Sequence, residues 1–463
     1  MTEQLKLKLN DSKATRWGAL VIVAFTMMAA YYVNDVVAPL KTMLETDLAW
    51  SSTDFGFFTG GYSFLNVFFL MLIWGGLILD RFGIRFTGKL ATILMVGGTA
   101  LEYYAMTGLA GADATLFGIN EIFGYKTGVF VAFAGYSIFG VGAEVAGIPV
   151  SKIIAKWFKG KELATAMGVQ VALARIGSQA GYAVAIPLAR AFGISTPVLL
   201  GLVLLLGGMI AFFIFAVMDK KLDKQMEAAA IAAGTEDEEE KFSFKDVKNI
   251  LVNPGFWLIA LLCVLFYSCV FPFQKFASEL MIIKYGINEN VAGTFAGLPA
   301  LGALILTPVF GGFIDKRGKS ASIMLLGSAM LICVHFIYAI PDINYWLVAI
   351  VLMIILGIAF SLVPSAMWPA VAKIFPVSQL GTAYALIFFI QNIGLWGIPT
   401  LIGWVLDAYC ISGKKPDGTN MYDYTVPMCI FTGIACLSLI VALLLKKADK
   451  KYGYKLEEPN IQK

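Results

Sequence analysis

Residues 158–168 read FKGKELATAMG, and residues 375–385 read FPVSQLGTAYA. The two stretches align without a gap and share Phe, Leu and a Thr-Ala pair at matching positions. A second pattern precedes each of them, since residues 75–85 read GGLILDRFGIR and residues 311–319 read GGFIDKRGK. Two motifs repeated in the same order indicate that the chain consists of two related halves.

The composition is that of a membrane protein. Of the 463 residues, 59% are hydrophobic and 14% are charged. Soluble domains are about 25% charged, and a soluble chain this apolar could not cover its surface with polar groups. We therefore expect an integral membrane protein of the all-α class. The net charge of +4, without a basic stripe, gives no indication of nucleic-acid binding.

Crossing a bilayer as a helix takes about 20 apolar residues. Twelve apolar runs predict twelve transmembrane helices, at residues 17–40, 55–79, 86–106, 128–155, 162–189, 196–218, 254–276, 290–313, 320–340, 346–372, 380–406 and 425–446. The expected organisation is an N-terminal segment 1–16, a six-helix half 17–218, a charged and solvated linker 219–250, a second six-helix half 251–446 and a tail 447–463.

The distribution of positive charge predicts the orientation. Lys and Arg gather in the N-terminal segment, in the tail, in the linker and in alternate loops. Because cytoplasmic loops carry the excess of Lys and Arg, we expect both termini and the linker to be cytoplasmic. The first apolar run is too long for a cleavable signal peptide, so it is read as a transmembrane helix. Short loops and Ile-rich helices suggest a bacterial plasma membrane.

Two parallel six-helix halves with a central linker resemble the major facilitator transporters. Residues 76–85 resemble the signature loop that follows the second helix of that superfamily, and residues 311–319 resemble a weaker copy. In the family, this loop holds the two halves together in one conformational state and releases them in another. The resemblance assigns gating roles to two sets of residues: Asp80, Arg81, Gly83 and Arg85, and Asp315, Arg317 and Gly318.

Longer stretches narrow the resemblance. Residues 157–178, residues 367–394 and VFPF at 270–273 are similar to the lysosomal dipeptide transporter group of the superfamily. The resemblance implies a dipeptide substrate that is moved by uniport. The animal transporter works with a glycosylated partner, but nothing in this sequence indicates an accessory subunit, and the tails carry no lysosomal sorting signal.

Two neighbouring apolar runs each contain one charge far from their ends, Glu144 and Arg175. Each lies about 20 Å from the cytoplasmic end of its helix, near the middle of a ~30 Å core. Each costs about 2.5–3.5 kcal/mol there, so we expect both to face the bundle interior. The two charges pair as a structural salt bridge, or Arg175 binds the carboxylate and Glu144 the ammonium of a zwitterion. The aligned residues of the second half, Asn392 and Ser361, are uncharged.

Other polar and aromatic side chains in these runs are candidates for the same cavity. Each of them also has a packing explanation, since aromatic residues fill cores and amides bridge helices. The candidates are Tyr31, Tyr32, Asn34, Asp35, Tyr62, Asn66, Phe273, Gln274, Trp368, Gln391 and Asn392.

The sequence argues against an enzyme. A single His leaves no Ser-His or Cys-His pair, no G-x-x-x-x-G-K-[ST] loop is present, and the six Cys form no disulfide framework or metal site. We expect no cofactor and no metal. The predicted function is an alternating-access dipeptide uniporter. The alternatives are a proton-coupled symporter, with Glu144 or Asp35 as the proton site, and a sensor that binds its ligand without transporting it.

Overall fold

The computed structural model describes residues 8–111, 114–158, 161–233 and 244–460. The helices of the first half are α1 (Lys13–Val36), α2 (Lys41–Asp47), α3 (Ser52–Phe68), α4 (Met71–Thr107), α5 (Thr127–Phe158), α6 (Leu163–Phe192) and α7 (Thr196–Ala233). Short elements accompany them: the 3-10 helices η1 (Leu9–Asp11) and η2 (Ala38–Leu40), and the strands β1 (Glu121–Ile122) and β2 (Tyr125–Lys126).

The second half is built in the same way. Its helices are α8 (Phe244–Val252), α9 (Pro254–Tyr285), α10 (Glu289–Ala296), α11 (Leu298–Arg317), α12 (Ser320–Ala339), α13 (Trp346–Ile374), α14 (Val377–Tyr409) and α15 (Thr425–Tyr452). An antiparallel hairpin of β3 (Ile411–Lys414) and β4 (Asn420–Tyr422) joins the last two helices.

The twelve predicted apolar runs are helical over most of their length, but the runs 55–79 and 290–313 are each divided between two helices, α3 and α4 in the first and α10 and α11 in the second. Nine helices of the described residues are long and apolar enough to cross a membrane, or ten when α3 and the start of α4, bent by 59°, count as one span. The helix α4 contains the end of the predicted run 55–79 and all of the run 86–106, and between them lies Gly83, where φ is +75°. Glycine suits this position because φ is positive there. The count of twelve spans stays a prediction.

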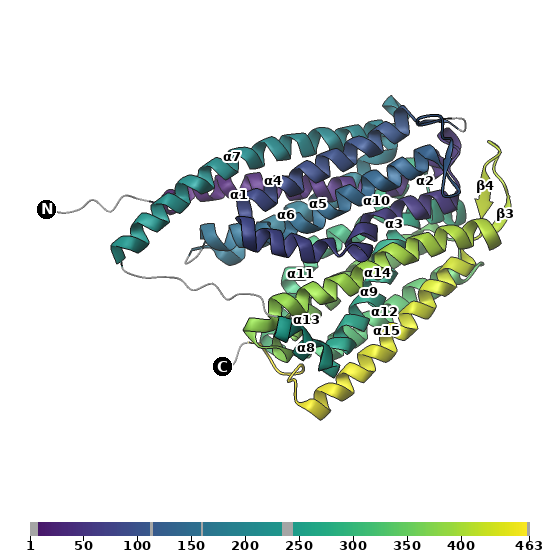
Figure 1. Ribbon diagram of the computed structural model, residues 1–463. Coiled ribbons are helices and arrows are strands. Elements are labelled where there is room, and N and C mark those ends of the chain that lie inside the picture. The colour runs from purple at the N-terminus through teal and green to yellow at the C-terminus, as the bar shows by residue number, and fades with distance from the viewer. Residues whose placement is uncertain (1–7, 112–113, 159–160, 234–243, 461–463) are drawn as a thin grey trace.

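The helices form two bundles. In Figure 1, α1–α7 make the upper bundle, α9 and α11–α15 make the lower one, and the short helix α10 is seen beside the upper bundle, where it contacts α6. The bundles meet at the end that carries β3 and β4, called here the hairpin end. They diverge toward the end at which α1 begins and α15 ends, called here the termini end.

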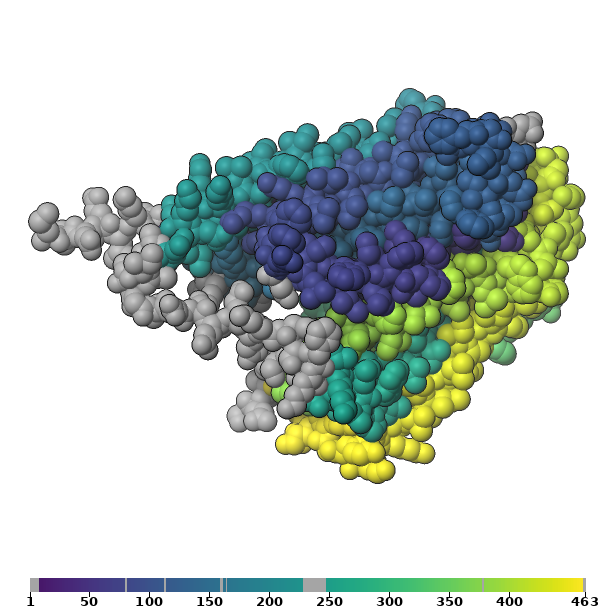
Figure 2. Space-filling model, in the orientation of Figure 1, coloured from purple at the N-terminus to yellow at the C-terminus, as the bar shows by residue number. Residues whose placement is uncertain are grey.

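Close packing of α3 against α14 joins the bundles, and Figure 2 shows the two elements in contact on one face of the molecule. A Cβ added to Gly56 would lie 2.4 Å from the carbonyl oxygen of Pro399 and 3.0 Å from the Cα of Gly403. Real Cβ atoms do not approach backbone atoms this closely. The contact between the halves therefore depends on glycine, as in other membrane helix pairs.

The segment predicted as a solvated linker begins as part of a helix. The helix α7 continues to Ala233, past the predicted end at residue 218. Asp219 is fully buried and accepts hydrogen bonds from Lys156 at 2.7 Å and from the indole of Trp157 at 2.9 Å. The acidic run that follows lies mostly in residues 234–243, outside the described part of the chain.

The beginning of the chain is fixed to the first half. The guanidinium of Arg16 donates to both carboxylate oxygens of Glu162, at 2.8 and 3.0 Å. This hydrogen bonding holds the pKa of the Glu162 carboxyl below its usual value. The backbone N–H of Leu9 donates to the side chain of Gln225 on α7 at 2.8 Å.

The end of the chain is fixed to the second half. Leu456 is fully buried, and its carbonyl accepts from the N–H of Ser320 at the start of α12. The carboxylate of Glu457 accepts from the N–H of Ser322 at 2.8 Å, so the tail caps a helix that has no cap of its own. Gly318 has φ +70°, and a Cβ there would lie 2.4 Å from the backbone of Glu458.

Candidate functional site

Glu144 is held by a tyrosine from a neighbouring helix. The hydroxyl of Tyr62, on α3, donates to the Oε1 atom of Glu144, on α5, at 2.9 Å. The two helices approach closely here because Gly140 has no side chain. A Cβ added to Gly140 would lie only 2.0 Å from the carbonyl oxygen of Tyr62. Both Glu144 and Tyr62 are half-buried. The carboxylate therefore has a fixed direction and retains accessible surface.

Arg175 lies between aromatic rings of the two halves. Its guanidinium carbon is 5.6 Å from the ring centre of Tyr31, on α1, and 5.0 Å from that of Phe360, on α13. Such cation–π contacts leave the edge of the guanidinium, with its N–H donors, open to an anion. Within the described ranges, no carboxylate forms an ion pair with Arg175.

The structure does not form the structural salt bridge between Glu144 and Arg175 that is one interpretation of the sequence. Glu144 bonds to Tyr62, and Arg175 stacks on rings. Both charged side chains are half-buried. Two half-buried opposite charges that do not pair with each other can each bind one end of a zwitterion.

Trp368 belongs to a group of aromatic side chains in the second half. Its ring stacks on Phe388 at 4.8 Å and approaches Tyr267 at 6.5 Å. Phe360 meets Phe271 edge-on at 5.3 Å and Tyr267 at 6.3 Å. We call these five residues the aromatic wall. The wall reaches Arg175 through Phe360, a contact that the sequence did not predict.

Asn34 and Asp35 belong to a second polar cluster, nearer the hairpin end. Lys275, on α9, donates to the carbonyl oxygen of Asn34 at 2.6 Å and lies 3.3 Å from the Asp35 carboxylate. The hydroxyl of Ser178 donates to the other Asp35 oxygen at 2.6 Å. Tyr136, on α5, donates to the Asn34 carbonyl at 2.7 Å. The cluster joins the two halves, and it occupies Asp35 with protein partners.

Three predicted site residues point elsewhere. The hydroxyl of Tyr32 donates to the carbonyl of Pro197 at the start of α7, at 3.2 Å. Gln274 donates to the carbonyl of Ala296 at 3.4 Å. The ring of Phe273 is fully buried inside the second half and packs against other rings, those of His335, Tyr338 and Phe431. These side chains are not brought to Glu144 and Arg175, because apolar runs do not specify which helix face meets the cavity.

The other three predicted amides are largely engaged within the bundles. Asn66 contacts the carbonyl of Tyr62 at 3.5 Å, one turn before it on α3. Asn392 donates to the carbonyl of Phe388 at 3.0 Å, and Gln391 accepts from the thiol of Cys263 at 3.3 Å. The carbonyl oxygens of Asn66 and Asn392 have no hydrogen-bond partner among the described residues, so each can still accept one.

A cluster of buried charges closes the hairpin end. The ammonium of Lys41, after η2, lies 2.5 Å from Glu45 and 2.5 Å from Glu279 of α9. Lys415, from the β3–β4 connection, lies 3.6 Å from Glu45 and 3.5 Å from Glu279. The hydroxyl of Tyr424 also donates to Glu279. Neither this cluster nor Lys275 was predicted from the sequence. These charges lie in a predicted loop or near the ends of predicted runs, where charged residues are common.

The residues of the first half that are predicted to act as a gate make contacts inside that half. Arg85 pairs with Asp219 at 3.2 Å and with Asp223, both on α7. Arg81 is exposed and stacks on its neighbour Phe82 at 5.5 Å. The side chain of Asp80 lies outside the described residues. This corner of α4 is therefore held by α7 at the termini end, where the bundles diverge (Figure 1).

The second gating set is held by the tail. Asp315 accepts from the side-chain amide of Asn460 at 2.8 Å, and Arg317 is exposed. Gly318 packs against the backbone of Glu457 and Glu458. The two gating sets thus occupy similar corners with different partners, acidic residues of α7 in one half and the tail in the other.

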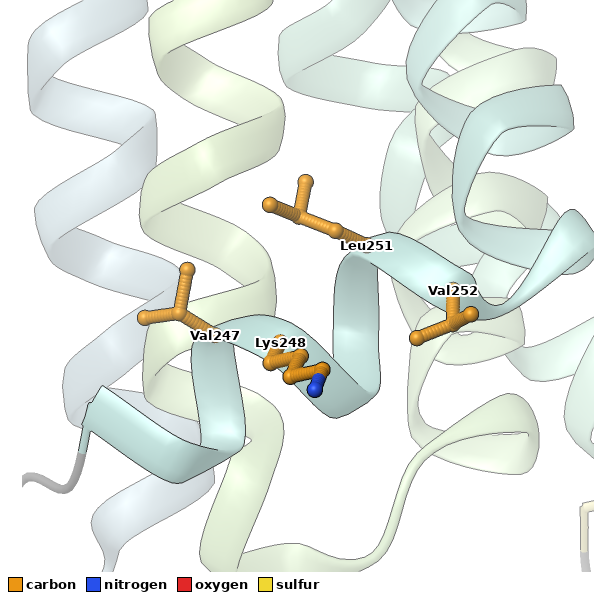
Figure 3. Close-up of a pocket in the computed structure, with 4 residues that line it drawn as sticks. All are labelled: Val247, Lys248, Leu251 and Val252. Atoms are coloured by element: carbon orange, nitrogen blue, oxygen red, sulfur yellow. The ribbon is translucent and has the colours of Figure 1, made fainter.

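A cavity of about 440 Å³ lies beside α8, away from these residues. Figure 3 shows its lining, which consists of Val247, Lys248, Leu251 and Val252. It contains a single charged side chain and none of the predicted site residues. A zwitterion needs two opposite charges, so this cavity is not the candidate site.

Comparisons with known proteins agree with this architecture. A family model described as Major Facilitator Superfamily matches residues 20–399 and 284–458. The chain is 29% identical over 454 residues to the lysosomal dipeptide transporter MFSD1 of Homo sapiens, covering 95% of this chain and 88% of the human one. It is 26% identical over 441 residues to the protein of the same name from Danio rerio, covering 93% and 86%.

Solved structures share the fold at low sequence identity. The nucleoside transporter NupG superposes with a TM-score of 0.68 at 12% identity, covering 92% of this chain and 98% of that one. The peptide transporter POT superposes with a TM-score of 0.65 at 15% identity, covering 95% and 94%. The family match spans most of the sequence, and the neighbours have the same two-bundle fold. This chain is therefore a multi-pass integral membrane protein that belongs to the Major Facilitator Superfamily, and it is of the transporter type and not an enzyme.

Proposed function

We propose that the chain is an alternating-access transporter of small zwitterionic peptides, and specifically of dipeptides. The observation that carries the proposal is the pair Glu144 and Arg175, two half-buried opposite charges that do not pair with each other. Relatives that align over most of the chain are named dipeptide transporters, which supports the same substrate class.

In this proposal each charge binds one end of the substrate. Arg175 takes the carboxylate, because a planar guanidinium matches its two oxygens in a bidentate contact. Glu144, oriented by Tyr62, takes the ammonium. The unpartnered carbonyl oxygens of Asn66 and Asn392 are further acceptors for the substrate. Charge-assisted hydrogen bonds of this kind are worth about 1.5–3 kcal/mol each.

The transport cycle would exchange the two ends of the molecule. Here the hairpin end is closed by Lys41 with Glu279 and by Lys275 with Asp35, and the termini end is spread. With both termini in the cytoplasm, as the positive charges predict, this is an inward-facing state. Opening the hairpin end breaks these pairs, and closing the termini end brings the gating residues of the two halves together.

We propose uniport as the mode of transport. Three of the buried acids, Asp35, Glu45 and Glu279, have a lysine partner, so they are neutralised by the protein itself. A fixed partner reduces the need to carry a proton. One observation favours the alternative of proton-coupled symport: Glu102, on α4, is fully buried, and neither carboxyl oxygen has a hydrogen-bond partner among the described residues.

The deciding experiment uses the purified protein in liposomes. Counterflow of a labelled neutral dipeptide should proceed without a pH gradient, and an imposed gradient should produce no steady accumulation. Accumulation driven by inward protons would replace uniport by symport. Binding without flux would favour the ligand-sensing alternative instead. Because the protein is assayed alone, the experiment also tests the expectation that no accessory subunit is needed.

The orientation of the chain and its membrane of residence are further parts of the proposal. We propose that both termini are cytoplasmic and that the two transport halves comprise residues 17–218 and 251–446. The relatives are named lysosomal, which lends no support to the expectation of a bacterial plasma membrane. Labelling of single cysteines placed in the N-terminal segment and in the β3–β4 hairpin, in intact cells, tests the orientation.

A further inference from the structure

The two charges of the candidate site lie in different surroundings. Beside Glu144, the hydroxyl of Tyr62 donates a hydrogen bond, and from the first half the ring of Tyr31 lies 5.6 Å from Arg175. Beside Arg175, the second half presents Phe360, and behind it the rest of the aromatic wall. Only one of the five residues of the wall, Tyr267, carries a hydroxyl. The carboxylate end of the site is thus the more apolar one.

The wall continues without interruption from Arg175. Phe360 lies under the guanidinium at 5.0 Å, Tyr267 and Phe271 follow at 6.3 and 5.3 Å, and Trp368 follows Tyr267 at 6.5 Å. Tyr267 also lies within electrostatic reach of Arg175. The series comes from two helices of the second half, α9 and α13, with Phe388 added from α14.

The wall has a buried base and an accessible surface. Phe360 and Tyr267 are 3% and 7% exposed, so they are packed by the protein. Phe271 and Trp368 are half-buried, and Phe388 is 36% exposed, so these rings retain surface that a ligand can cover. Aromatic rings with free faces beside a charged anchor favour an apolar or aromatic group of the ligand.

We propose that the aromatic wall is the subsite for the side chain of the C-terminal residue of the dipeptide, and that it gives a preference for aromatic or large apolar residues at that position. This inference rests on the proposed function. In a dipeptide, the Cα of the C-terminal residue is bonded directly to the carboxylate. If Arg175 holds the carboxylate, the adjacent side chain must lie near the groups around Arg175, which form the wall.

Positional isomers give a test that does not depend on overall hydrophobicity. Ala-Phe and Phe-Ala contain the same atoms and bury the same apolar groups when fully bound. Each should compete with counterflow of labelled Ala-Ala into liposomes that contain the wild-type protein. Aromatic contacts add about 0.5–1.5 kcal/mol, so Ala-Phe should compete at roughly two- to tenfold lower concentration than Phe-Ala.

A pair of variants assigns the preference to the wall. Trp368→Leu removes its largest ring and should bring the two isomers close to equal competition. Trp346→Leu is the matched control, because Trp346 lies on the same helix α13 at its other end and is 48% exposed. It should keep the wild-type ratio.

The outcomes separate this inference from the proposed function. Equal competition by the isomers at the wild-type protein, or stronger competition by Phe-Ala, overturns the subsite while dipeptide transport stands. A preference that persists in Trp368→Leu also overturns it. If no dipeptide is transported, the proposed function fails and the subsite fails with it. If Trp368→Leu does not fold, the competition of Ala-Phe and Phe-Ala at the wild-type protein still tests the subsite by itself.

Discussion

The hydroxyl of Tyr62, on α3, donates a hydrogen bond of 2.9 Å to Glu144, on α5. This contact occupies one carboxylate oxygen of Glu144 with a neutral donor and leaves its charge uncompensated by any basic side chain of the described residues. Arg175 likewise has rings and no acid as neighbours. Among the described residues, neither charge is paired with an opposite charge, so both remain available to a ligand.

The first prediction concerns these two charges. Glu144→Ala and Arg175→Ala should each reduce dipeptide affinity by roughly 10–150-fold, the equivalent of a lost charged hydrogen bond of about 1.5–3 kcal/mol. Arg175→Lys should recover little, because an ammonium does not form a bidentate contact. The measurement is dipeptide binding, with thermal stability of each variant as the control. A stable double variant that binds dipeptide normally would remove both residues from the site.

The second prediction concerns the cluster at the hairpin end. Lys41→Met leaves Glu45 and Glu279 short of one partner, and breaking a buried pair costs about 3–5 kcal/mol. The closed hairpin end should lose population, so an impermeant maleimide should label Ser52→Cys faster than it does in the parent protein. Ser52 is fully buried there against α14.

The matched control for Lys41→Met is a bridge between the halves that is exposed. Arg190 pairs with Glu289, and both side chains are about 40% exposed. Such pairs are worth about 0–1 kcal/mol, so Arg190→Gln should change the labelling of Ser52→Cys little. Equal labelling of the parent protein and of Lys41→Met would show that the buried cluster does not hold the hairpin end closed.

The third prediction concerns the glycine contact between α3 and α14. Gly56→Leu would place a side chain against the backbone of Pro399 and Gly403, which cannot move aside as a flexible side chain would. The hairpin end should fail to close, and flux should be lost. Gly397→Leu is the control, since a Cβ there meets nothing within 4 Å. Normal flux in Gly56→Leu would mean that this contact is not needed in the cycle.

The fourth prediction concerns the gating loop. If Asp80 latches the halves at the termini end in the opposite state, Asp80→Ala should raise the inward-facing population and slow counterflow. Dipeptide binding in detergent should change little, because Asp80 belongs to the predicted gating loop and not to the pair proposed to bind the dipeptide. Asp342→Ala, an exposed acid at the other end, should have no effect on counterflow. Unchanged counterflow in Asp80→Ala would remove it from the latch.

Much of the architecture could be predicted because long apolar runs indicate the membrane helices and repeated motifs indicate the two halves. The runs are helical over most of their length, and the family assignment drawn from the repeats is confirmed. Glu144 and Arg175 could be singled out because a charge inside an apolar run costs free energy and needs a reason. The boundary at residue 218 could not be predicted, because the polar residues after it extend α7 instead of ending it.

The rest of the site depends on which helix faces meet. Lys275 and Lys41 resemble loop charges until α9 and α2 are seen to continue the buried structure past them. Phe360 is one apolar residue in a run of apolar residues, so nothing in the sequence distinguishes it from its neighbours. Tyr32 and Phe273 are residue types that often line binding sites, but here their side chains contact other helices. Periodicity gives a helix, but the packing partner decides what each face contacts.

The two ends of the chain are anchored to different bundles. Leu9 and Arg16 attach the beginning of the chain to the first half, and Leu456 and Glu457 attach its end to the second. A donor dye at residue 10 and an acceptor dye at residue 460 would therefore each move with one half, so the distance between the dyes would report the separation of the two halves. Energy transfer between them would follow the opening and closing of single molecules without any label inside the membrane.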